Sequence, residues 1–406
     1  MVNKPTLSRL ATAITIVGAF LCSCGPAAID FSTATTPPLT DEAWNPVNDP
    51  TRIGVKPAKF SDLPREGMLT QDKYPWSDDY WPTRRGGTAY RWQMPHTNHT
   101  GTYRDYLYPP MPRDAFTGPA TQIAAMIARL SPAEKYDLWK GRYDFPLLQH
   151  ERRATHAAVD PIAQDVPHWV GLCHGWAPAT LLEPEPGPLA EVINPDGLTV
   201  PFYTSDINAL MTKIYADYQP RAPILGERCG RYTHTIPLDP SGRILIESCR
   251  DVNPGALHLI LTQLLSGDNA KGFVVDITNG HEVWNQAVTG FKVLSAEVRP
   301  HNPNVDPRAK FRAPGTKDLA IVVTEMSYVT EVAAHRAPLK QQYQDYTKTL
   351  RLEYMLELDA AGIVIGGEWA SDNRPDFLWI PTAKPLETQL ISYQDVSALL
   401  ATSRSH

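Results

Sequence analysis

The spacing of apolar residues changes along this chain, from a helical period in its first half to a strand period in its second. Apolar side chains recur at intervals of three and four within residues 123–130 and 207–218, which predicts amphipathic helices. Beyond Arg243 the apolar runs are short and bounded by turn residues, as in 273–275 and 319–323, which predicts strands. Because helices precede strands instead of alternating with them, we expect an α+β fold, in which a helix packs on an antiparallel sheet.

The N-terminal residues predict export. Lys4 and Arg9 precede an apolar run, residues 10–21, that is too short to cross a bilayer as a helix. A small residue then stands directly before Cys24, as in a bacterial lipobox, where the cysteine is lipidated after cleavage. We therefore expect residues 1–24 to be a lipoprotein signal peptide, with Cys24 as membrane anchor in the cell envelope, or in the outer membrane where two membranes exist. A secreted protein with a cleaved signal and incidental cysteines is the alternative.

Composition divides the rest of the chain. Residues 25–112 are rich in proline and aromatic residues and show no sustained period, so we expect a tether and wrapping arm there. We assign residues 113–385 to a catalytic domain and residues 386–406 to a C-terminal tail. The net charge of −6, without a long basic run, argues against a nucleic acid as partner.

Three cysteines remain after Cys24, and an exported protein meets an oxidising environment that favours their pairing. Cys229 and Cys249 flank a turn-rich stretch, residues 237–242, and we expect them to form a disulfide. Two buried thiols are the alternative. In either case Cys173 is left over, and an unpaired thiol outside the cytosol invites a functional explanation.

The sequence around Cys173 is suited to a nucleophile. Gly171 two positions before it, and small residues with Trp176 just after it, permit a tight turn into the start of a helix. At such a position the backbone N–H groups and the helix dipole stabilise a thiolate and can bind a developing oxyanion. His174 is adjacent, but neighbours i and i+1 on a helix do not face each other, so we expect it to support the wall of the site.

A nucleophilic cysteine needs a base from elsewhere in the fold and a group to orient it. His258 lies inside an apolar run, where an imidazole is unfavourable without a partner, and Asp276 ends a buried-looking strand. We expect a triad of Cys173, His258 and Asp276, although a lone buried histidine is more often a core residue. His281 and His234 are the rival bases.

Two further sets of residues are candidates for supporting roles. Tryptophans 169, 176 and 284 are core residues in the simplest interpretation, but as walls of a substrate groove they would exclude water from an acyl-enzyme. The loop containing Asp372, Asn373 and Asp376 offers oxygen ligands for calcium. A polar turn is the interpretation that we favour for this loop, and the sequence requires no cofactor.

Several motifs, in correct order, resemble a known family. They are residues 173–179, 250–258, 283–286, 366–369 and 375–379. These segments are similar to the secreted transglutaminase elicitor family, which is known from plant pathogens and has bacterial relatives. The similarity runs from about Trp169 to Pro381.

The resemblance implies a papain-like core of the transglutaminase type and protein-glutamine gamma-glutamyltransferase activity. Cys173 would attack a glutamine carboxamide, ammonia would leave, and a lysine amine would resolve the thioester, while His258 moves the protons and Asp276 orients it. The partners would be proteins or peptides that carry glutamine and an amine. Calcium dependence is common among transglutaminases.

Two other classes of function remain. A cysteine peptidase or amidase would pass through the same acyl-enzyme, so the residues alone do not separate aminolysis from hydrolysis. A non-catalytic surface-recognition protein is the other alternative, because in this family the stretch matching residues 283–295 is the peptide that plant hosts recognise. Here Ala287 replaces a proline and Thr289 an arginine of that pattern.

Overall fold

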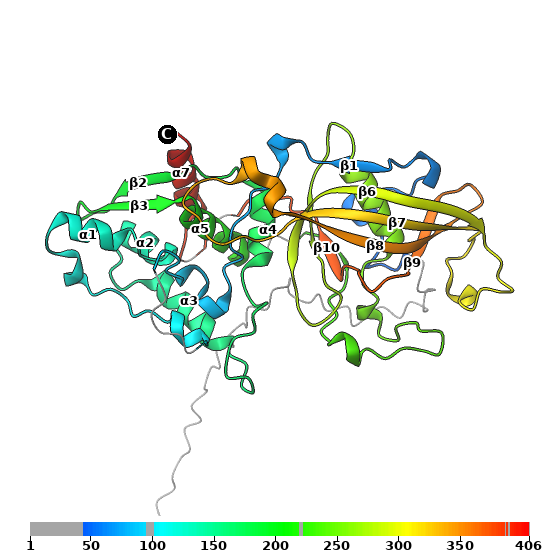
Figure 1. Ribbon diagram of the computed structural model, residues 1–406, viewed down its shortest axis with the longest axis horizontal. Helices are drawn as coiled ribbons and strands as arrows, with labels where there is room; N and C mark the ends of the chain where they lie inside the picture. Colours follow the sequence, from blue (N-terminus) through cyan, green and yellow to red (C-terminus); the bar gives the residue numbers. More distant parts are fainter. Residues whose placement is uncertain (1–43, 95–100, 219–221, 386, 389, 406) are drawn as a thin grey trace, which may run out of the picture.

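The computed structural model describes residues 44–94, 101–218, 222–385, 387–388 and 390–405. The predicted signal peptide and Cys24 lie outside these residues. Figure 1 shows an elongated molecule with a helical part at one end and a large sheet at the other. Within the described ranges, no helix is both long enough and apolar enough to cross a bilayer.

The helical part contains the helices that the apolar period predicted. Ser131 caps its helix in a reciprocal capping box with Glu134. The helix of residues 204–217 buries Ile207 and Leu210 completely. The α-helices of the described residues are α1 (Ala120–Ile127), α2 (Pro132–Trp139), α3 (Pro146–Ala157), α4 (Cys173–Leu182), α5 (Thr204–Asp217), α6 (Pro254–Leu264) and α7 (Tyr393–Arg404).

The large sheet is antiparallel throughout and has the strand order β4-β10-β5-β6-β7-β8-β9, with β1 paired to β6. A separate hairpin, β2 and β3, lies in the helical part (Figure 1). The strands are β1 (Glu66–Met68), β2 (Leu189–Ile193), β3 (Thr199–Tyr203), β4 (Ile224–Gly226), β5 (Phe273–Asp276), β6 (Asn285–Pro300), β7 (Asp318–Val329), β8 (Thr347–Leu358), β9 (Val364–Trp369) and β10 (Phe377–Trp379). The expected α+β class and antiparallel sheet are confirmed.

Helix α4 lies between the helical part and the sheet (Figure 1) and is the element that brings Cys173 to the sheet. It is apolar on all sides and packs on α5 and on β6, which explains why its residues from Cys173 to Thr180 are buried. Gly175 allows the close approach of α5, because a Cβ there would lie 2.6 Å from the amide nitrogen of Ala216.

The proline-rich N-terminal segment packs as a structural part of the molecule. Residues 44–94 form short 3₁₀ turns and the single strand β1, and two of their four tryptophans, Trp76 and Trp81, are buried. At one end the segment hydrogen-bonds to the sheet through the pair Val364 N–H to Ala58 O. Farther along it hydrogen-bonds to the loop before α4. It therefore joins the sheet to the helical part.

Candidate active site

Cys173 is the first residue of α4, and only 1% of it is exposed. The Nδ2 of Asn285 donates a hydrogen bond to the sulfur over 3.5 Å, and the sulfur lies 3.7 Å from the carbonyl oxygen of Val283. The positive end of the helix dipole and the amide donor both favour a thiolate at this place. The expected helix-start position of Cys173 is thus observed.

The turn before Cys173 is shaped by a residue of the N-terminal arm. The Leu172 N–H donates to the Tyr80 carbonyl over 2.9 Å, and a Cβ at Gly171 would lie 2.6 Å from the Tyr80 ring. Glycine is required because any side chain would collide with that ring. Tyr80 also packs against Trp284, with ring centroids 5.3 Å apart. Sequence reasoning missed Tyr80 because its only signal is the aromatic richness of the arm.

Asp276 ends β5 and pairs in register with Asn285, which opens β6. Its Oδ1 accepts three hydrogen bonds, from the Thr278 N–H (3.1 Å), the Thr278 hydroxyl (2.7 Å) and the Trp284 N–H (2.9 Å). Its Oδ2 and the Oδ1 of Asn285 are buried, and neither has a hydrogen-bond partner among the residues that the structure describes. Asn285, which contacts the thiol, and Asp276, which pairs with it, therefore each present one buried acceptor without a donor in the described part of the chain.

Burial raises the pKa of Asp276 to about 7, and the negative charge of Cys173 adds to the rise. The hydrogen bonds from Trp284 and Thr278 oppose it in part. A carboxyl group with this pKa can accept a proton and return it near neutral pH. Asp276 is therefore near enough to Cys173 for their charges to interact, and its pKa suits proton transfer near neutral pH.

The structure places His258, which the sequence predicts as the base, in the core of the molecule. It lies on α6, is 1% exposed, and its Nδ1 is 2.8 Å from the Tyr354 hydroxyl on β8. Its ring packs against Phe60 of the arm. Burial lowers the pKa of His258 to about 3, and the charge of Arg65 contributes to the decrease. The reason is the packing of α6, which faces β8 and β9, whereas Cys173 contacts the start of β6.

The two rival histidines, His281 and His234, lie at different distances from the cluster around Cys173. His281 is in the loop between β5 and β6, and its ring packs on Trp169 with centroids 5.5 Å apart. Trp169 belongs to the same apolar cluster as Cys173. The His281 ring also contacts Tyr232, whose ring stacks on the exposed His234. His281 is thus at the rim of the nucleophile's cluster, and His234 lies farther out.

The predicted groove residues separate into two groups. Trp169 and Trp284 join the apolar cluster around Cys173, together with Phe377, and so line the site. Trp176 is fully buried in the main core of the molecule and is a structural residue. His174 is buried in α4 directly after the nucleophile, where its ring cannot face the same direction as the thiol.

Cys229 and Cys249 form a disulfide, and Cys173 is outside it. The three loop residues considered as calcium ligands have different surroundings. The buried Asp376 accepts a hydrogen bond from the Cys229 N–H over 2.9 Å, whereas the Asp372 carboxylate is fully exposed. Asn373 donates to a backbone carbonyl of β8. Within the described ranges, no group of three acidic, histidine or cysteine residues is arranged to hold a metal.

Comparisons with known proteins show the family and a similar fold. A family model described as transglutaminase elicitor matches residues 56–406, which includes most of the arm and the helix α7. The crystal structure of the GP42 transglutaminase from Phytophthora sojae has a similar fold, with a TM-score of 0.60 and 24% sequence identity. The similarity covers 90% of this chain and 99% of that chain. No curated protein matches the chain.

Proposed function

Because the chain belongs to the transglutaminase elicitor family, we propose that it is a cysteine acyltransferase that moves the acyl group of a glutamine side chain to an amine. The observation that carries the proposal is the buried carboxyl group of Asp276, whose pKa of about 7 reflects both burial and the nearby Cys173. A nucleophile and a group that can exchange its proton near neutral pH are the minimum that acyl transfer requires.

In the first half-reaction Asp276 takes the proton of the Cys173 thiol, and the sulfur attacks the carboxamide carbon of glutamine. The tetrahedral intermediate collapses to a thioester as the proton on Asp276 passes to the leaving nitrogen, so that ammonia departs. In the second half-reaction Asp276 takes a proton from the incoming amine, which attacks the thioester and releases the thiol. Atoms and protons balance over the cycle, and Asp276 serves alternately as base and acid.

Asn285 is suited to recognise the carboxamide. Its Nδ2 donates to the sulfur, which leaves its Oδ1 and the Oδ2 of Asp276 as buried acceptors without donors in the described part of the chain. A primary carboxamide has two N–H donors that match two acceptors, whereas a carboxylate or an ester offers none. This arrangement favours glutamine and asparagine side chains over their acids. The aromatic rings of Tyr80, Trp169 and Trp284 would exclude water and favour amines over hydrolysis.

The substrates of this reaction are proteins or peptides with accessible glutamine and an amine. We retain export, with lipidation at Cys24, as part of the proposal on the strength of the N-terminal sequence. The reaction described here requires no metal.

Host recognition of residues 283–295 has less support as a function of the folded protein. This stretch runs into β6, which is flanked by β5 and β7 in the sheet. Residues 285–291 are all buried. A receptor would therefore reach residues 285–291 only after proteolysis or unfolding, whereas Lys292, Leu294 and Ser295 are exposed.

The experiment is incubation of the protein with a glutamine-containing peptide and a fluorescent primary amine, while ammonia release is followed in parallel. We expect amine incorporation and ammonia release in equal amounts, both abolished in Cys173→Ala. The rate should increase with pH through about 7, because Asp276 must lose its proton before it can act as base. Ammonia release without amine incorporation would identify an amidase, and neither product would refute the catalytic proposal.

A further inference from the structure

Residues 229–249 form a loop that the disulfide closes at its base, and we call this segment the disulfide loop. The α-carbons of Cys229 and Cys249 lie 4.5 Å apart, and both cysteines are buried. Three large apolar side chains of the loop are more than half exposed, namely Tyr232 (59%), Leu238 (56%) and Leu245 (53%). Apolar side chains gathered on one exposed segment are typical of surfaces that bind another molecule.

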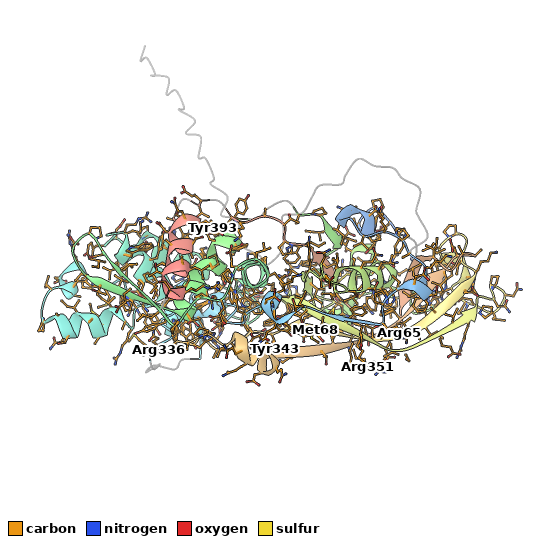
Figure 2. The ribbon with its side chains drawn as sticks, turned by 90° about the horizontal axis from the view of Figure 1, so that it is seen from above. Arg65, Met68, Arg336, Tyr343, Arg351 and Tyr393 are labelled. Carbon is orange, nitrogen blue, oxygen red and sulfur yellow. A yellow bond between two sulfur atoms is a disulfide. The ribbon has the colours of Figure 1, made fainter. Side chains whose placement is uncertain are left out.

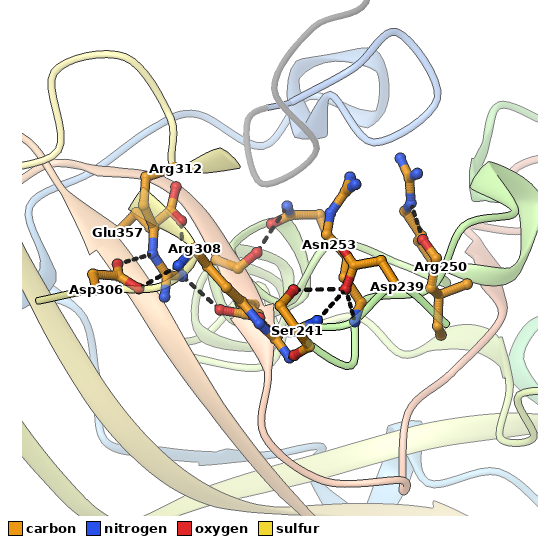
Figure 3. Close-up of polar contacts among 12 residues, drawn as sticks. Asp239, Ser241, Arg250, Asn253, Asp306, Arg308, Arg312 and Glu357 are labelled. Atoms are coloured by element: carbon orange, nitrogen blue, oxygen red, sulfur yellow. Dashed lines mark hydrogen bonds and ion pairs between the residues drawn. The ribbon is translucent and has the colours of Figure 1, made fainter. Parts of the chain in front are cut away.

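The far end of the disulfide loop is also held in place. The Asp239 carboxylate accepts hydrogen bonds from the Ser241 N–H (2.8 Å), the Ser241 hydroxyl (2.7 Å) and the Arg243 N–H (3.0 Å). Arg308, from the connection between β6 and β7, donates to the Ser241 carbonyl over 2.7 Å (Figure 3). Because the loop is fixed at both ends, it loses less entropy when it binds a partner than a free loop would.

An aromatic path joins the disulfide loop to the apolar cluster of the nucleophile. Trp169 belongs to that cluster, and its ring centroid lies 5.5 Å from the His281 ring, which in turn lies 4.7 Å from the Tyr232 ring. The backbones also meet, because a Cβ at Gly280, between β5 and β6, would lie 3.3 Å from the Arg231 carbonyl oxygen. Tyr232 is therefore the place where this path reaches solvent.

Arg228, just before the disulfide loop, borders the same path. Its guanidinium carbon lies 5.5 Å from the centre of the Trp169 ring, and its Nη2 donates to the His281 carbonyl over 3.2 Å. Its Nε is buried and has no hydrogen-bond partner in the described part of the chain. The path thus combines apolar rings with a spare donor for which a peptide carbonyl is a suitable acceptor.

The burial of the nucleophile determines where a polypeptide substrate would lie. Only 1% of Cys173 is exposed, so a glutamine would reach it with its side chain extended, while the main chain stays at the surface. The residues next to the glutamine would then contact the surface beside the nucleophile's cluster. The aromatic path to the disulfide loop is part of that surface.

We propose that the disulfide loop binds the glutamine-bearing polypeptide, with an apolar residue next to the reactive glutamine packed on Tyr232 and His281. The partner is the donor substrate of the acyl-transfer reaction, so this inference rests on the proposed function. Aromatic rings that are already positioned provide a large contact area at low entropic cost. Leu238 and Leu245 offer further apolar area to residues farther along the polypeptide. The loop therefore selects glutamines with apolar neighbours over glutamines with polar neighbours.

Peptide binding to the Cys173→Ala chain, which forms no acyl-enzyme, tests the docking surface separately from catalysis. The probes are two fluorescent heptapeptides with a central glutamine, flanked by leucine in one and by serine in the other, and fluorescence anisotropy gives the Kd. We expect the leucine peptide to bind about tenfold more tightly, because partial burial of an apolar side chain contributes free energy of that order. Tyr232→Ser, added to this chain, should remove most of the difference, whereas Tyr232→Phe should keep it.

Met68→Ser is the matched control. Met68, labelled in Figure 2, is 57% exposed on β1 and lies outside the cluster around the nucleophile, so its replacement should leave both Kd values unchanged. Equal binding of the two peptides would overturn the inference, as would an undiminished preference in a Tyr232→Ser chain that is folded by near-UV circular dichroism.

Two further outcomes separate this inference from its neighbours. A dimer of the unliganded chain in analytical ultracentrifugation that Tyr232→Ser dissociates would assign the surface to a second copy and overturn the proposed partner. If the leucine preference depends on Tyr232 but the chain with Cys173 intact incorporates no amine, the acyl-transfer proposal fails and the docking surface stands. Amine incorporation without a difference in binding between the peptides gives the opposite result.

Discussion

Burial shifts the pKa values of Asp276 and His258 in opposite directions, because each prefers its neutral form away from water. For Asp276 the result is a pKa of about 7, useful for proton transfer near neutral pH. For His258 the result is a pKa of about 3, which leaves the ring neutral and unable to deliver a proton as an acid in that range. The same physical effect therefore gives one residue a catalytic property and makes the other a structural residue.

Substitution of these two residues separates the two assignments. We expect Asp276→Asn to lower the rate of amine incorporation by roughly 10²- to 10⁴-fold, the usual contribution of a general base, because asparagine cannot accept the thiol proton. His258→Gln, which retains a polar partner for Tyr354, should keep a rate close to that of the parent. The measurement is kcat/KM for a glutamine peptide with a fluorescent amine. The opposite order of effects would restore His258 as the base.

The pH dependence of protein stability tests whether His258 acts in the core. The pKa of His258 is lower in the folded protein than its ordinary value near 6.5, so the unfolded chain binds more protons below that pH. The stability that neutral His258 provides is therefore present above about pH 6.5 and decreases as the pH falls toward 3. Between pH 7 and pH 5, the free energy of unfolding measured with urea should decrease less in His258→Gln than in the parent.

At the scale of elements, α4 is held by a crossing with α5 that tolerates no side chain at Gly175. The site depends on this crossing, because α4 carries the nucleophile at its first residue and meets the start of β6. The β5 and β6 pair is the second fixed element. Its register places Asp276 opposite Asn285, and that register decides which carboxyl lies near the thiol.

Substitution of Gly175 by alanine should destabilise the protein. The added Cβ would lie 2.6 Å from the Ala216 amide nitrogen and 2.7 Å from its Cβ, and overpacking of this kind costs about 1–3 kcal/mol. Urea unfolding measures the loss, and the displaced helix should also lower the acyl-transfer rate. Gly230→Ala is the matched control, since nothing lies within 4 Å of a Cβ there. Equal stability of the two variants would contradict the tight crossing.

At the scale of the whole molecule, the N-terminal arm joins two parts that are remote in Figure 1. Its strand β1 extends the sheet at β6, and its tryptophans enter the core of the helical part. Tyr80 reaches the loop before the nucleophile. The composition suggests that the arm wraps loosely around the molecule. In the structure, the arm is a component of both the fold and the site.

A chain shortened to begin at residue 113 should therefore fail to fold. It would lose the buried side chains of Tyr74, Trp76 and Trp81, and removal of one large buried aromatic side chain alone costs about 3–5 kcal/mol. A chain that begins at residue 44 is the control and should fold. Near-UV circular dichroism of the two soluble products is the measurement. A cooperative unfolding transition in the shorter chain would show that the arm is dispensable.

Local sequence determined the features that depend on a few neighbouring residues. The apolar period predicted α5, and the turn at Gly171 predicted a helix that begins at Cys173. The capping box of Ser131 and Glu134 at the start of α2 is equally local. Periodicity, capping and turn formation are short-range effects, so a single sequence contains enough information to identify them. The α+β class follows from the order of such elements, and the family motifs added the expected chemistry.

Only the tertiary structure decided which residues meet the thiol. His258 and Asp276 are similar in sequence terms, each a polar residue in an apolar run, but α6 packs its histidine against β8 while β5 brings its carboxyl toward α4. Asn285 and Tyr80 reach the site from positions 112 residues after and 93 residues before the nucleophile in the chain, through strand register and through the course of the arm. Contacts at such separations depend on how elements pack and pair, and no local pattern of residues encodes that choice.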